Sequence, residues 1–129
     1  MVILKTTLNQ LKLLQMDFRA LIKKSFGVDI PIKNGFGSSY ETAVVMELVL
    51  PHNEYIHTQY VYIKYLAILR DIKWKMISQE LVFKEGKTFD IMKIETKEKV
   101  GKKILTFMET HYFDITECWE YEAAIKIEV

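Results

Sequence analysis

The chain has 129 residues, of which 50% are apolar and 27% are charged, and its formal net charge is +1. This apolar content is enough to form a core, which excludes an intrinsically disordered chain, and the length predicts a single domain over residues 1–129. Only two of the 18 basic residues are arginines, Arg19 and Arg70, and the near-neutral charge provides no field that would attract nucleic acid or an anionic membrane.

An apolar stripe predicts a helix from about residue 8 to residue 26. Thr7-Leu8-Asn9-Gln10 fits a capping box at its start, and Gly27 fits the left-handed residue that follows a helix. The stripe recurs at steps of three and four residues, through Leu8, Leu11, Leu14, Phe18, Leu21 and Ile22.

The next segment contains a glycine-rich loop, Gly35-Phe36-Gly37-Ser38-Ser39, ahead of a predicted strand from Tyr40 to Leu50. A dinucleotide-binding loop would carry a third glycine at position 40 and would open a helix rather than a strand. We therefore interpret the loop as a turn, with Asn34-Gly35 at its centre. The strand is apolar around Glu47, which is typical of an interior strand covered on both faces.

A second helix is predicted from about residue 54 to residue 71, with Asn53 as its N-cap. Two apolar faces flank a narrow polar line, so the helix is either central to the monomer or contributes a self-association surface. One face contains Ile56, Tyr60, Ile63 and Ala67. The other contains the candidate interface residues Tyr55, Tyr62, Leu66 and Leu69.

Residues 74–84 and 87–95 are predicted to form a β-hairpin around Lys84-Glu85-Gly86. A two-residue loop would pair Val82 with Phe89, whereas a three-residue loop would pair Leu81 with Phe89. We prefer the three-residue loop because it gathers more apolar residues on one face, and we expect Gly86 at positive φ.

A third strand is predicted from about residue 103 to residue 115, and residues 116–129 fit either a helix or a strand. The predicted class is therefore α+β. We expect an antiparallel-rich sheet of about four to five strands with two main helices packed on it, in the order α-β-α-β-β-β.

One candidate for metal chemistry is the set Asp90, Glu95 and Lys97, which has the spacing seen in metal-dependent nucleases. Acid-x-Lys triplets occur about as often here as chance predicts. Asp90 and Glu95 would also face opposite sides of a regular strand. We therefore disfavour a nuclease site and expect no metal and no cofactor.

The histidines and the single cysteine provide no clear catalytic pattern. His52 and His57 lack the spacing of a zinc site, and a nucleophile pair of His111 and Cys118 is less expected than a buried thiol. One cysteine allows no internal disulfide, which favours a reducing compartment. With no recognisable signal peptide and no apolar run long enough to span a bilayer, we expect a cytoplasmic protein.

Acids and aromatics alternate near the C-terminus, which suits either recognition of a basic partner or an amphipathic element with one wet face. We favour the amphipathic element. The acids are Asp114, Glu117, Glu120 and Glu122, and the aromatics are Tyr112, Phe113, Trp119 and Tyr121.

We expect a non-catalytic interaction or regulatory module that binds a protein partner or a second copy of itself. The alternative is a small-ligand binder or enzyme with a helix–sheet pocket. A deep pocket with convergent polar groups would favour this alternative, and a flat apolar patch would favour the interaction module. The residues that would line the pocket are Tyr40, Tyr60, Trp74 and Trp119.

Overall fold

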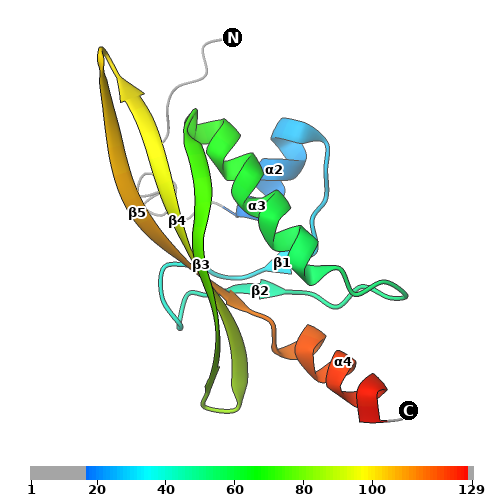
Figure 1. Ribbon diagram of the computed structural model, residues 1–129. Helices are drawn as coiled ribbons and strands as arrows, with labels where there is room; N and C mark the ends of the chain where they lie inside the picture. Colours follow the sequence, from blue (N-terminus) through cyan, green and yellow to red (C-terminus); the bar gives the residue numbers. More distant parts are fainter. Residues whose placement is uncertain (1–16, 128–129) are drawn as a thin grey trace.

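The computed structural model describes residues 17–127 and contains one five-stranded sheet with three helices (Figure 1). The strands lie in the order β1-β2-β5-β4-β3, and every neighbouring pair is antiparallel except β2 with β5. This arrangement confirms the predicted α+β class. The elements are α2 (Phe18–Phe26), β1 (Ile32–Lys33), β2 (Val44–Met46), α3 (Tyr55–Arg70), β3 (Lys73–Lys84), β4 (Lys87–Val100), β5 (Lys103–Asp114) and α4 (Thr116–Ile127).

The main core lies between the sheet and helices α2 and α3, which share one face of it (Figure 1). Met92 and Ile94 of β4 and Phe113 of β5 point toward the helices and are buried against Tyr62 and Leu66 of α3. A smaller cluster lies around Phe89 and Ile91, which alternate with the first set along β4 and therefore face the opposite side.

Helix α2 begins at Phe18, because Asp17 is extended (φ −73°, ψ 106°) and its side chain accepts the amide hydrogen of Ala20 at 3.2 Å. One continuous helix from residue 8 is therefore wrong. The apolar period runs past Asp17, so periodicity alone could not reveal this cap. The capping box at Thr7 lies outside the described residues. Gly27 adopts the predicted left-handed conformation, with φ 71°.

The strand predicted for residues 40–50 is shorter than expected and occupies only Val44–Met46. It lies between β1 and β5, so its interior position is confirmed. The segment before it is a turn, because the amide of Ala43 bonds to the carbonyl of Tyr40. The two-residue strand β1, which pairs Ile32 with Met46, was not predicted.

Helix α3 matches its prediction to within one residue at each end, but its cap does not. Glu54 occupies the N-cap position. The amide group of Asn53 instead donates to the Cys118 carbonyl at 3.0 Å and to Glu122 Oε1 at 3.2 Å. Asn53 therefore ties α4 to the segment that precedes α3.

The β3–β4 hairpin has a two-residue loop, so the preferred three-residue register is wrong. Val82 pairs with Phe89, and Glu85 (φ 51°) and Gly86 (φ 76°) are both left-handed, as a type I′ turn requires. The positive φ of Gly86 is confirmed. Leu81 and Phe83 are exposed, so burial of apolar side chains does not determine the register. The register instead follows from the type I′ turn, whose backbone twist matches that of the strands.

The C-terminal segment forms a helix, α4, which starts directly after β5 and lies at the end of the sheet opposite the β4–β5 hairpin (Figure 1). The Asp114 carboxylate accepts the amide hydrogen of Thr116 at 3.0 Å and helps to start it. None of the helices in residues 17–127 is long and apolar enough to cross a membrane.

Candidate functional site

The polar groups of the glycine-rich loop form hydrogen bonds within the loop and to β5, as those of a structural turn do. The amide of Gly37 bonds to the Thr42 carbonyl at 2.7 Å, and the Gly37 carbonyl accepts from Tyr112 at 2.8 Å. Ser38 and Ser39 both place their hydroxyls within 2.9 Å of Thr42 Oγ1. These contacts fix the loop against β5 and support its interpretation as a turn.

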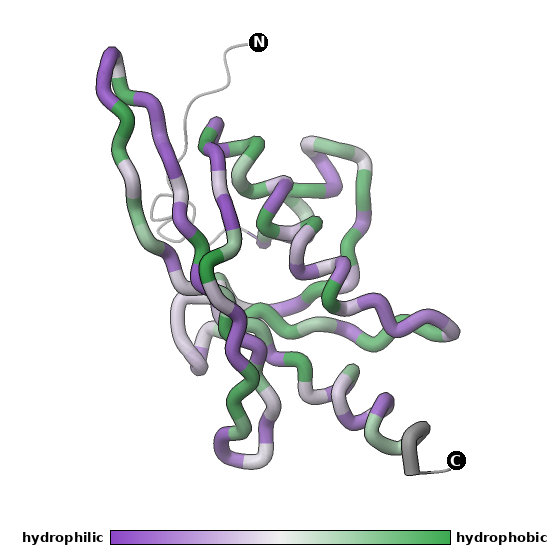
Figure 2. The backbone as a smooth tube through the Cα atoms, in the orientation of Figure 1, coloured by the Kyte–Doolittle hydropathy of each residue, from purple (hydrophilic) through white to green (hydrophobic). Residues whose placement is uncertain are grey.

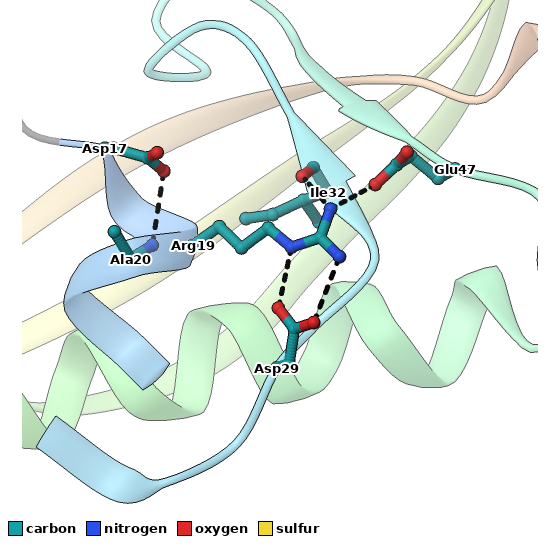
Figure 3. Close-up of polar contacts among 6 residues, drawn as sticks. All are labelled: Asp17, Arg19, Ala20, Asp29, Ile32 and Glu47. Atoms are coloured by element: carbon teal, nitrogen blue, oxygen red, sulfur yellow. Dashed lines mark hydrogen bonds and ion pairs between the residues drawn. The ribbon is translucent and has the colours of Figure 1, made fainter. Parts of the chain in front are cut away.

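Arg19 forms the most connected polar cluster near α2 (Figure 3). Its Nε and Nη2 donate to the two carboxylate oxygens of Asp29, at 2.7 and 3.2 Å. Its Nη1 donates to Glu47 and to the Ile32 carbonyl. The hydrogen bond from Arg19 lowers the pKa of Asp29, and the same bond raises the pKa of Arg19. The cluster therefore ties α2 to β1 and to the end of β2.

Two surface cavities share Arg19 as a lining residue. The larger, of about 460 Å³, lies between the start of α2 and the Lys33–Phe36 segment, and the smaller, of about 340 Å³, extends toward His52 and the start of α3. Arg19 is neutralised by two carboxylates, so it presents no unpaired charge to a ligand. Within the part of the chain that the structure describes, no group of three or more His, Cys, Asp or Glu side chains could hold a metal ion.

The candidate nuclease residues are not brought together. Asp90 faces α3, is 5% exposed and accepts hydrogen bonds from the amide groups of Gln59 and Gln79. Glu95 lies on the other face of β4 and pairs with Lys75 at 3.7 Å. Glu95 and Lys97 line a small cavity of about 150 Å³ to which Asp90 does not contribute.

A partly buried polar cluster that sequence reasoning missed lies between α3 and β5. Arg70 donates two parallel hydrogen bonds to the Glu109 carboxylate, at 2.9 and 2.5 Å, and His111 Nε2 lies 3.1 Å from the same carboxylate. Burial acts to raise the pKa of Glu109, but the bonds from His111 and Arg70 outweigh it and lower this pKa to about 2. The available signal was the alternation of Glu109 and His111 at helix-facing positions of β5.

The candidate nucleophile pair of His111 and Cys118 is not assembled. His111 contacts Glu109, whereas the Cys118 thiol is fully buried and lies 3.6 Å from the Met46 carbonyl oxygen. Burial, with Glu117 and Glu122 nearby, raises the pKa of Cys118 to about 11. The thiol therefore stays protonated at neutral pH, as an inert core residue does.

The four aromatic residues expected to line one pocket lie in three places, which corrects that part of the small-ligand alternative. Tyr40 packs against Phe89 and Tyr112, on the sheet face opposite α3. The ring of Tyr60 lies 6.2 Å from that of Trp74, and the ring of Trp119 lies 5.9 Å from that of Phe83. They separate because Tyr40 lies on the opposite face of the sheet, and because Trp74 and Phe83, which contact Tyr60 and Trp119, lie near opposite ends of β3.

The candidate interface residues of α3 lie against the core of this chain. Tyr55, Tyr62 and Leu66 are buried, and Leu69 is partly buried. The other predicted face is divided, with Ile63 and Ala67 buried and with Ile56 50% and Tyr60 36% exposed. Of the two roles considered for α3, the central one matches this packing.

The largest collection of exposed apolar side chains lies on the hairpin between β4 and β5, which projects beyond β3 (Figure 1). Pairing of β3 with β4 ends at Lys73 and Lys97, whereas β4 and β5 stay paired as far as Val100 and Lys103. We call residues 98–108 the arm: residues 98–105 lie beyond the last β3 pair, and Phe107 and Met108 lie opposite Thr96 and Glu95, level with the end of β3. Figure 2 shows the apolar stretches of the hairpin on β5, whereas the β4 strand of the arm is mostly hydrophilic. Its exposed apolar side chains are Val100, Ile104, Leu105, Phe107 and Met108, with exposed fractions from 39% to 66%.

These arm residues do not form a single stripe. Ile104 and Met108 point to one side of the hairpin, and Leu105 and Phe107 point to the other, because side chains alternate along a strand. No family model, curated protein or solved structure gave a significant match to the chain. Function is therefore argued from this geometry.

Proposed function

We propose that the protein is a non-catalytic interaction module that contacts a protein partner through the arm. The observation that carries the proposal is the concentration of five exposed apolar side chains on one hairpin, three of them beyond the last residue pair of β3 and β4. A two-stranded hairpin is only marginally stable in water, and contiguous exposed apolar surface usually marks an interface. A partner that covers both sides of the arm would remove this surface from water.

The charges of the arm indicate the kind of partner that would fit it. Lys99, Lys102 and Lys103 outnumber Glu98 and surround the apolar residues. Interfaces commonly place an apolar centre inside a charged rim, and rim charges guide association. We therefore propose a partner surface that has an apolar centre and acidic residues around it.

A cytoplasmic location is part of the proposal. It is supported by the single cysteine, whose thiol is buried and free. We favour a protein partner over nucleic acid because the chain has only two arginines and a net charge of +1. Arg19 and Arg70 are both bound to carboxylates within the fold.

The arm can be tested without disturbing the sheet. Replacing Lys99–Ile104 by Asn-Gly would close a type I′ turn on the pair Glu98–Leu105, which has the same hydrogen-bonding phase as Val100–Lys103. The deletion removes Val100 and Ile104, and the same variant would carry threonine in place of Leu105, Phe107 and Met108, so that no exposed apolar residue of the arm remains. Tagged wild-type protein and this shortened variant would be compared in pull-downs from native lysate. Each captured protein would then be purified and its direct affinity measured.

A matched control is Ile56→Lys, which adds a charge at an exposed apolar position on α3, away from the arm. We expect to capture a partner protein that binds wild type and Ile56→Lys with equal affinity. Its affinity for the shortened variant should be at least tenfold lower, which is about the effect of losing one anchoring contact. If every captured protein binds the shortened variant as well as it binds wild type, the arm is not the interaction element.

A second candidate function, small-ligand binding, has the 460 Å³ cavity beside Arg19 in its favour, since this volume is typical of ligand sites. Lys33 lines the cavity and is exposed, so Lys33→Trp would fill it without touching the core. A compound that raises the melting temperature of the wild type but not of Lys33→Trp would place the cavity ahead of the arm.

A further inference from the structure

Strand β3 forms one edge of the sheet, and among the described strands it pairs only with β4. Lys84 and Lys87 flank the two-residue turn, so they form its closing hydrogen-bonded pair. Hydrogen-bonding direction alternates along a strand. The main-chain groups that point away from β4, and that another strand could bind, are therefore those of Gln79, Leu81 and Phe83.

Two apolar side chains on this edge are exposed to solvent. Leu81 is 42% exposed and Phe83 is 65% exposed, and the charged residues Glu80 and Lys84 beside them are exposed too. A bulge between Met76 and Ser78 interrupts the strand, so the regular edge starts at Ser78. Such an edge is a template for pairing with another chain.

We propose that β3 pairs antiparallel with β3 of a second copy of this chain, about a two-fold axis at Val82. Leu81 then lies opposite Phe83 of the second copy, on the helix side of the sheet. Glu80 lies opposite Lys84 of the second copy, on the other side. Because of the two-fold axis, each of these pairs occurs twice in the dimer.

Charge complementarity selects this register over its neighbours. An axis at Leu81 would place Phe83 opposite Gln79 and Glu80 opposite Val82, and so would forgo both favourable pairs. An axis at Glu80 would place two glutamates directly opposite each other, which is destabilising. Only the axis at Val82 joins opposite charges and also pairs the two exposed apolar residues.

The Lys84 ammonium lies over the sheet of its own chain. Its Nζ lies 4.1 Å from the centre of the Tyr40 ring, which holds the charge on the face of the sheet opposite α3. Glu80 and Val82 project to the same face as Lys84. In the dimer, the Lys84 side chain would turn from Tyr40 toward the edge to meet the carboxylate of Glu80 from the second copy.

Self-pairing goes beyond the proposed function and uses a different surface. Residues 80–84 lie next to the β3–β4 turn, whereas the arm begins beyond the other end of β3 (Figure 1). Pairing at Val82 therefore leaves the arm of each copy uncovered. The resulting dimer would present two arms to partners.

The test measures the mass and the self-affinity of the full chain by analytical ultracentrifugation over a concentration series. We expect a dimer of twice 15.2 kDa. Glu80→Lys and Lys84→Glu should each weaken it at least about tenfold, because each creates two like-charge pairs. The double variant Glu80→Lys/Lys84→Glu should restore the wild-type affinity.

Two further variants separate pairing from folding. Leu81→Pro removes an amide that points away from β4, so the dimer should be lost while the circular dichroism spectrum stays that of the folded chain. Lys73→Glu makes the same charge change as Lys84→Glu on the same strand, but outside the paired segment, and should leave the dimer intact.

A monomeric wild type at high micromolar concentration would overturn the proposal. So would a double variant that fails to regain the dimer. A dimer that is lost in the arm-shortened variant but retained in Glu80→Lys and Leu81→Pro would also overturn it, and would show instead that the arm binds the second copy. Failure of the edge would thus be distinguishable from failure of the arm.

Discussion

Glu109 shows how a single partly buried carboxylate can make stability depend on pH. Its pKa is lowered to about 2 in the folded chain, from an ordinary value of 4.5, by its bonds to His111 and Arg70 against the opposing effect of burial. A lowered folded pKa contributes stability that is fully present above about pH 4.5 and is lost as the pH falls toward 2. We expect wild type to lose on the order of 2 kcal/mol in this range through Glu109 alone, after allowance for screening by solvent.

Glu109→Gln should be less stable than wild type at pH 7, because it leaves the Arg70 charge unpaired, and its stability should vary less between pH 5 and about pH 2.5. Urea unfolding at several pH values would measure this. Glu120→Gln, on the exposed surface of α4, is the control and should run parallel to wild type. Parallel curves for wild type and Glu109→Gln would contradict the assignment.

Gly35 and Gly86 make a matched pair of left-handed glycines. A Cβ added at Gly35 would lie 2.0 Å from the Thr42 carbonyl oxygen, whereas one added at Gly86 would meet no atom within 4 Å. Gly86→Ala should therefore cost about 1 kcal/mol through backbone strain alone. Gly35→Ala should cost about 3 kcal/mol or more, because the glycine loop must also shift.

Chemical unfolding of both variants would test the comparison. Equal losses of unfolding free energy would mean that the glycine-rich loop shifts without cost. That result would contradict the constraint expected from the bonds of Gly37 to Thr42 and Tyr112.

Helix α3 illustrates what periodicity can and cannot resolve at the scale of an element. Both predicted faces are apolar, so the sequence alone could not say which one is buried. The packing of α2 and the sheet covers Tyr62 completely, also buries Ile63 and Ala67 of the other predicted face, and leaves Ile56 of that face half exposed. Gln59, a polar residue on the covered side, is accommodated because it donates to Asp90.

We expect Tyr62→Arg to lower the unfolding free energy by more than about 3 kcal/mol, because it buries an unpaired charge. Ile56→Arg should change it by less than about 0.5 kcal/mol, as an exposed substitution does. Thermal and urea unfolding of the two variants would decide. Equal effects at the two positions would mean that the buried face of α3 is misassigned.

At the scale of the whole molecule, the arm is separate from the core. None of its exposed apolar residues belongs to either core cluster. Replacing Lys99–Ile104 by Asn-Gly should therefore leave the unfolding free energy within about 1 kcal/mol of wild type, since it removes only ladder bonds at the end of a hairpin. An arm-shortened chain that fails to fold would show that the arm supports the sheet, and the binding experiment would then need point variants such as Ile104→Lys.

Local patterns in the sequence by themselves determined the α+β class, the extent of α3, the interior position of β2, and the left-handed residues Gly27 and Gly86. These features follow from apolar periodicity and backbone sterics, which act over a few residues. Tertiary structure decided the rest. It decided the hairpin register, which is set by the geometry of the turn and not by burial of the exposed side chains. It also decided the role of Asn53, which bonds to Cys118 and Glu122 instead of capping α3.

The candidate surfaces belong to the tertiary level as well. The apolar residues of the arm have the sequence pattern of an ordinary strand, and only the fold shows that they are 39% to 66% exposed. The edge at Leu81 and Phe83 likewise depends on the strand order, which places β3 outermost. Whether a side chain is exposed depends on which segments pack against it. Those segments are placed by strand order and by the length of strand pairing, which are set by contacts between residues far apart in the chain.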